Sequence, residues 1–141
     1  MTKDARTKDT PLKVVTLRTP AAEVGTRQAL PNLRGITHFT AGAKNISMNL
    51  VIIPPGGKSV PHVHRDCETA IYVLQGRIDT RYGKGLKFSE INETGDFVYI
   101  PANLPHQPVN LSATHEARAL VAHSAGDDQL SVETYDPDSD T

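Results

Sequence analysis

The sequence contains one cysteine, Cys67, no tryptophan, and no apolar run long enough to span a bilayer. A single cysteine excludes a disulfide within the chain, which fits a reducing compartment. The first eleven residues, MTKDARTKDTP, lack the apolar core of a secretory signal. We therefore expect a soluble, cytoplasmic protein that does not contact a membrane.

A dominant charge is also missing, because 15 Lys and Arg residues face 16 Asp and Glu residues. Basic residues gather in the first twenty positions, and acidic residues, including Asp127 and Asp128, gather near the end. Neither block has the density or the interleaved aromatic residues of a nucleic-acid surface. We interpret both ends as solvated and expect no nucleic-acid partner.

The length of 141 residues, 38% of them hydrophobic, suits one domain with a single core. We expect a disordered lead-in at residues 1–11, one domain at 12–135, and an acidic tail at 136–141. A sustained helical period is absent, and short apolar or alternating runs are separated by Gly and Pro. This pattern predicts an all-β sandwich or barrel. The expected strands are residues 12–17, 45–53, 69–74, 77–82, 87–91, 96–100, 116–123 and 129–135.

One stretch, residues 56–76, carries the clearest chemistry. Side chains alternate along a strand, so His62 and His64 point to the same side. Glu68 has the same parity and adds a carboxylate oxygen. Two imidazoles and a carboxylate form a ligand set that suits iron, manganese, zinc, nickel or copper. The stretch therefore predicts part of a metal site.

A second stretch, residues 95–110, supplies a further candidate ligand. His106 lies in a loop between Pro105 and Pro108. Proline fixes φ, which lowers the entropy lost when the neighbouring side chain is ordered. We expect His106 to be the fourth ligand.

These two stretches resemble the two motifs of the cupin superfamily. The first motif is Gly, five residues, His-x-His, three or four residues, Glu, six residues, Gly. The second is Gly, five residues, Pro-x-Gly, two residues, His, three residues, Asn. Eight of the ten positions match, and they are Gly56, His62, His64, Glu68, Gly95, Pro101, His106 and Asn110. The resemblance implies an all-β cupin fold, the double-stranded β-helix or jelly-roll barrel.

The two departures are Asn103, in place of the middle glycine, and Gly76, which comes one residue late. Asparagine tolerates the positive φ that glycine adopts. The extra residue before Gly76 leaves two arrangements open. A β-bulge would let Glu68 face the interior as a ligand, which we expect; without one, Thr69 takes the glutamate position and three histidines hold the metal.

The resemblance implies one divalent ion, Fe, Mn, Zn or Ni, and a small oxygen-bearing substrate. We expect a metal-dependent enzyme, either a dioxygenase or an isomerase, lyase or decarboxylase. A non-catalytic metal- or sugar-binding cupin that senses or carries a small molecule is the alternative. The two classes differ in whether an acid or base reaches the metal-bound ligand, and the candidates are His123, Tyr99 and Lys58.

Residues 12–17, LKVVTL, are separated from the core by a long loop. Such a strand can add to the sheet edge of a second chain. We therefore expect a homodimer.

Overall fold

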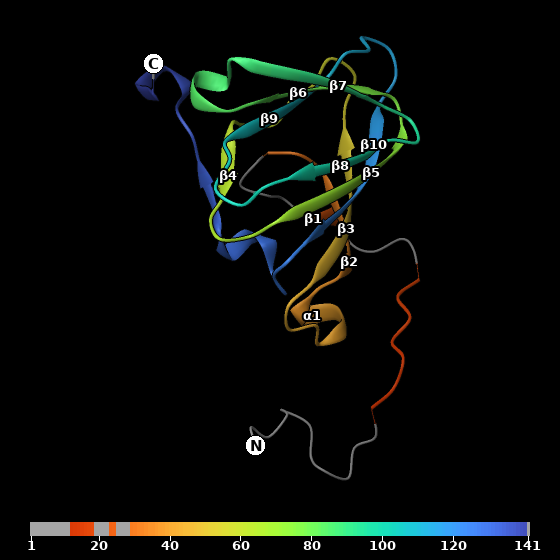
Figure 1. Cartoon of the computed structure of the whole chain (residues 1–141). Coiled ribbons are helices and arrows are strands. Elements are labelled where there is room, and N and C mark those ends of the chain that lie inside the picture. Colours follow the sequence, from red (N-terminus) through yellow and green to blue (C-terminus); the bar gives the residue numbers. More distant parts are fainter. Residues whose placement is uncertain (1–11, 19–22, 25–28, 141) are drawn as a thin grey trace.

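Antiparallel strands form two sheets that face each other (Figure 1). The computed structural model describes residues 12–18, 23–24 and 29–140. The larger sheet has the order β1 (Glu23–Val24), β2 (Asn32–Ile36), β3 (Ser47–Ile53), β10 (Ala117–His123), β5 (Thr69–Gln75) and β8 (Phe97–Ile100). The smaller sheet has the order β11 (Val132–Thr134), β4 (His62–His64), β9 (His106–Asn110), β6 (Arg77–Tyr82) and β7 (Phe88–Glu93). This architecture confirms the predicted jelly-roll cupin fold.

The remaining elements of the described residues are short. They are α1 (His38–Ala41) and three 3₁₀ turns, η1 (Lys84–Leu86), η2 (Asp128–Leu130) and η3 (Pro137–Asp140). The α1 turn begins at Thr37, whose hydroxyl accepts hydrogen bonds from the backbone of Phe39 and Thr40 as an N-cap. Among the described residues, no helix is both long and apolar enough to cross a membrane.

The core lies between the sheets because alternate side chains of each strand are apolar. In β3, Asn49, Val51 and Ile53 face inward. Ile53 joins the central buried cluster, which consists of Leu30, Ile53, Val73, Ile78 and Ala117. The outward side chains of β3 are also apolar, which is unusual for the solvent side of a sheet.

A β-bulge interrupts the pairing of β5 with β10. Ala119 pairs with Val73, and the next residue of β10, Arg118, pairs with Gln75, so Leu74 has no partner on β10. Between Thr69 and Val73 the alternation is regular. The extra residue that delays Gly76 is therefore absorbed at the end of β5 far from the histidines.

Two positions with positive φ shape the turns near the motifs. Gly76 has φ 103°, and a Cβ there would lie 2.8 Å from the Cβ of Ala117. Asn103 has φ 67°, so it adopts the conformation expected from its place in the second motif.

The predicted strand at residues 12–17 is wrong for the single chain. Residues 12–18 are exposed and extended, and no strand ladder includes them. Figure 1 shows this segment running away from the two sheets. The predicted lead-in at 1–11 lies outside the described residues. At the other end, residues 137–140 form η3, and the preceding Tyr135 hydroxyl accepts a hydrogen bond from the Gly85 backbone at 2.8 Å.

Candidate metal centre

Three histidines from adjacent strands converge between the sheets. His62 and His64 lie on β4, and His106 on β9 is the direct cross-strand partner of His62. One nitrogen of each ring lies within 4.8 Å of the others, and all three side chains are buried. The structure therefore brings together the three histidines that the sequence singled out.

Hydrogen bonds orient two of these rings. His62 Nδ1 lies 2.8 Å from the Val60 carbonyl oxygen, and His106 Nδ1 lies 2.9 Å from that of Leu104. A carbonyl oxygen only accepts, so each Nδ1 carries the proton and each Nε2 keeps a lone pair. This arrangement, with the second nitrogen bonded to a carbonyl, is typical of metal-binding histidines. His64 Nδ1 is buried and has no hydrogen-bond partner in the described part of the chain.

The cluster is uncharged at neutral pH. Burial, aided by the neighbouring His106, lowers the pKa of His62 to about 3. Burial, aided by His123 and His62, lowers the pKa of His64 to about 2. Burial also lowers the pKa of His106 to about 4. Three neutral imidazoles with neighbouring nitrogens fit a divalent transition metal ion such as zinc or iron.

The loops that follow the two motifs hold each other in place. The backbone N–H of Asn103 donates to the His64 carbonyl at 3.0 Å, and its side-chain oxygen accepts from the Asp66 backbone at 3.0 Å. Asp66 itself has φ 54°. These contacts fix the exit of β4 against the approach to His106.

Glu68 does not join the histidines, contrary to expectation. Its side chain is exposed, and its carboxylate accepts a hydrogen bond from the Tyr99 hydroxyl on the outer side of the larger sheet. The reason is the position of the bulge at Leu74. Because regular alternation begins at Thr69, the inward side of β5 carries Thr69, Ile71 and Val73.

Tyr99 is likewise placed away from the cluster. Its side chain is 60% exposed, and the hydrogen bond to Glu68 raises the pKa of its hydroxyl. The expectation that Tyr99 acts as an acid or base at the histidines does not fit this geometry. Lys58, a further candidate, is exposed and lines neither of the cavities described below.

Thr69 and His123 take the place expected for the carboxylate. They are direct partners across β5 and β10, and the His123 ring centroid lies 4.5 Å from that of His64. Thr69 Oγ1 and His123 Nδ1 are both buried without a hydrogen-bond partner among the described residues. His123 is therefore the one predicted catalytic residue that lies at the cluster.

Asp128 lies beside His123 and was missed by the sequence reasoning. It begins η2 and is only 5% exposed, although it was assigned to a solvated acidic end. Burial lowers the pKa of His123, and the charge of Asp128 acts in the opposite direction. Nothing in the sequence distinguishes Asp128 from Asp127, since the turn that buries it has no strong local signal.

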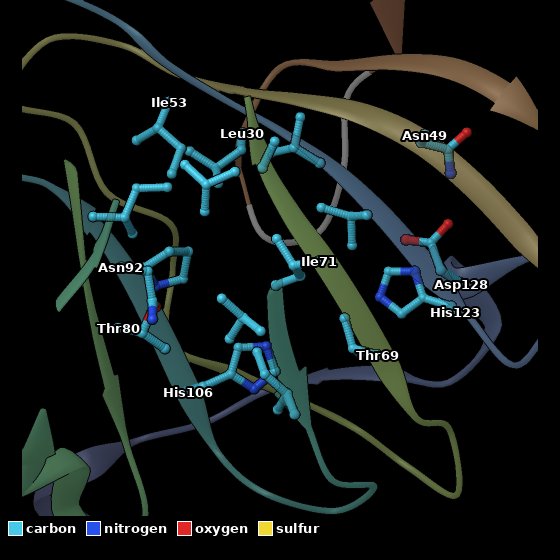
Figure 2. A pocket seen from close by; sticks show the side chains of 18 of the residues that line it. Leu30, Asn49, Ile53, Thr69, Ile71, Thr80, Asn92, His106, His123 and Asp128 are labelled. Atoms are coloured by element: carbon cyan, nitrogen blue, oxygen red, sulfur yellow. The ribbon is translucent and has the colours of Figure 1, made fainter. Parts of the chain in front are cut away.

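A cavity of about 80 Å³ adjoins the histidines (Figure 2). A second space of about 350 Å³ lies between β8 and the strands β6 and β7. The two spaces share Thr80, Asn92, Val98, Ile100 and His106. The larger space therefore offers a route from the sheet edge to His106.

Comparisons with known proteins agree with this geometry. A family model described as a cupin domain matches residues 49–123, which is more than half of the chain. No curated protein matches the chain.

Many solved structures are similar. The polyketide cyclase RemF from Streptomyces resistomycificus has a TM-score of 0.71 and 22% identity, covering 89% of this chain and 87% of that one. A recombinant oxalate oxidase in complex with glycolate has a TM-score of 0.68 and 21% identity, covering 93% and 75%. A sugar phosphate isomerase from Silicibacter pomeroyi has a TM-score of 0.57 and 23% identity, covering 74% and 69%. These likenesses concern the fold, and together with the matched family model they place the chain in the cupin domain family.

Proposed function

We propose that this protein is a metal-dependent enzyme that binds one divalent ion through His62, His64 and His106. The substrate is a small oxygen-bearing molecule held in the adjoining cavity. The neighbouring folds belong to a cyclase, an oxidase and an isomerase, which supports an enzyme without selecting a reaction.

The observation that carries the proposal is the close grouping of three buried imidazoles with free lone pairs. The Nδ1–H groups of His62 and His106 are bound to backbone carbonyls, so their Nε2 atoms keep lone pairs, and one nitrogen of each of the three rings lies within 4.8 Å of the others. Neutral lone pairs packed together without a donor are unfavourable in a buried site. A divalent cation removes this penalty for all three rings at once.

A bound ion would supply Lewis-acid chemistry, or dioxygen chemistry if it is iron. The chain's own residues contribute binding and proton transfer. His123 is neutral at pH 7 because burial lowers its pKa, so it has a lone pair that accepts a proton from a substrate hydroxyl. The nearby Asp128 carboxylate stabilises the imidazolium that results. The apolar walls exclude water from this end of the cavity.

The experiment is elemental analysis of protein purified without an affinity tag or chelator, beside the variants His106→Ala and Glu68→Gln. We expect about one ion per chain in the wild type and in Glu68→Gln, and a loss in His106→Ala. Melting temperature with and without added zinc provides a second reading, since an ion that binds only the folded state stabilises it.

Two outcomes would contradict the proposal. Failure of the wild type to take up any divalent ion on reloading would remove the metal site. Loss of the ion in Glu68→Gln, together with its retention in His106→Ala, would show that the proposed ligands are wrong. A metal-loaded protein that binds small molecules without turnover would support the alternative of a sensor or carrier.

A further inference from the structure

The cavity of about 80 Å³ that adjoins the histidines, the inner cavity, has mostly apolar walls, and neither it nor the second space carries much charge. The residues that line the inner cavity with aliphatic side chains or proline are Leu30, Val51, Ile53, Ile71, Val73, Ile78, Val98, Ile100, Pro108, Ala119 and Val121. Across residues 29–140, no lysine or arginine lines either space. The charged residues that do are Asp128 and Glu90, and both are acidic.

Uncharged polar groups lie on two sides of the inner cavity. Figure 2 shows Asn49 and His123, next to the acidic Asp128, on one side, and Thr80 and Asn92 on the other. Asn49 Oδ1 accepts a hydrogen bond from the Gly35 backbone at 2.8 Å, so its NH₂ group remains as a donor. Thr80 Oγ1 donates to Asn92 Oδ1 at 2.6 Å, which leaves the Asn92 NH₂ group as a second donor.

This composition determines which ligands the cavity can accept. A carboxylate or phosphate placed beyond the histidines would lose its hydration without meeting a cation, and the acidic residues would repel it. A hydroxyl or carbonyl oxygen meets amide donors on either side, and an apolar body meets the aliphatic walls.

We propose that the substrate is an uncharged, largely apolar molecule that bears hydroxyl or carbonyl oxygens, with no anionic group outside the part that faces the histidines. This inference rests on the proposed function, whose substrate class it names. It separates this site from one built for phosphorylated sugars or for small dicarboxylates.

The test compares two probes of nearly equal size, 4-methylcatechol and 3,4-dihydroxybenzoate, by calorimetric titration at pH 7. Both carry the same adjacent hydroxyls, and they differ in a methyl against a carboxylate at the far end of the ring. With zinc-loaded protein, we expect 4-methylcatechol to bind at least about 100-fold more tightly, because a buried carboxylate would have no partner. Zinc is used because it has no redox chemistry with catechols.

A matched pair of variants locates the effect. Val98 lines both spaces from the edge strand β8. Val98→Lys should recover binding of the carboxylate probe, whereas Val98→Met, which has similar length and no charge, should not.

The inference would be overturned if the wild type bound 3,4-dihydroxybenzoate as tightly as 4-methylcatechol or more tightly. It would also be overturned if neither probe bound. The titrations are repeated on metal-free protein, where the walls should still prefer the methyl probe. A chain that takes up no zinc but keeps this preference would refute the metal proposal and leave the substrate class standing.

Discussion

Acid should destabilise the metal-free protein through its histidine cluster. An unfolded histidine has an ordinary pKa of about 6.5. Burial in the folded chain lowers the pKa of His62 to about 3, of His64 to about 2 and of His106 to about 4. Below pH 6.5 the unfolded chain therefore binds protons that the folded chain does not. The free energy of unfolding must fall as the pH falls, whereas above about pH 7 both states are neutral and the cluster adds no pH dependence.

The size of the effect follows from the same pKa values. Between pH 7 and pH 5, each of the three histidines lowers the free energy of unfolding by about 2 kcal/mol, so the cluster lowers it by about 6 kcal/mol. Burial also lowers the pKa of His123, which acts in the same direction. Because single domains are stable by about 5–15 kcal/mol, the metal-free protein should come close to unfolding at pH 5.

The assay is urea unfolding followed by circular dichroism at pH 7, 6 and 5 in the presence of a chelator. The variant His106→Asn should reduce the pH dependence by about a third. His38→Asn, which replaces an exposed histidine, should leave it unchanged. A free energy of unfolding that stays flat from pH 7 to pH 5, or a slope insensitive to His106→Asn, would refute the reasoning.

Three further predictions concern single positions. Thr69→Glu should raise the metal affinity by about tenfold or more, since it directs a carboxylate to the histidines. Competition with a chelator measures the affinity, and Thr69→Val is the neutral control. A metal affinity below that of the wild type would contradict this prediction. Gly76→Ala should destabilise the protein by about 2 kcal/mol or more, because the new Cβ would meet the buried Ala117. Gly42 also has positive φ, but a Cβ there would meet open space, so Gly42→Ala should cost about 1 kcal/mol. Urea unfolding measures both variants. Asn110→Ala should cost about 2–4 kcal/mol, because the two hydrogens of the buried Asn110 NH₂ group serve three backbone carbonyls within hydrogen-bonding distance, and its side-chain oxygen accepts from one backbone N–H. An unchanged unfolding midpoint would show that these bonds are dispensable.

The fold and the grouping of the three histidines could be predicted from the sequence because both depend on local chemistry. His62 and His64 are two residues apart on a strand, and this spacing alone places them on one face. His106 was found from its proline-rich loop and its place in the second motif. Positive φ at Asn103 followed from the tolerance of asparagine for that region.

The face of β5 was not predictable, because it depends on where a bulge forms. One extra residue between the histidines and Gly76 is consistent with a bulge at either end of the strand. The structure places it at Leu74, where Gln75 and Val73 take successive partners on β10. That choice is made by pairing with a strand more than forty residues away in the sequence, so no local pattern reports it.

Asp128 and Asn49 were missed for a related reason. The pattern around Asp128 predicts a solvated end of the chain, and the pattern around Asn49 predicts the interior of a strand. Their approach to the cavity comes from packing between the two sheets. The exposed placement of residues 12–18 also differs from the predicted strand, since none of the strands in the described part of the chain pairs with them.

The bulge at Leu74 also bears on how motifs of this kind are transferred between relatives. Motif spacing counts residues along the chain, whereas the side of a strand is set by its ladder partners. An insertion beyond the bulge leaves the inner face unchanged, while one before Thr69 would exchange the two faces of β5. In relatives, the ligand contributed by β5 should therefore be identified as the residue that pairs with the equivalent of His123. The number of residues that separate it from the equivalent of His64 is not a reliable guide. This rule separates relatives that have a carboxylate at the position paired with His123 from those that have a neutral hydroxyl there. The two groups differ in the net charge of the metal site.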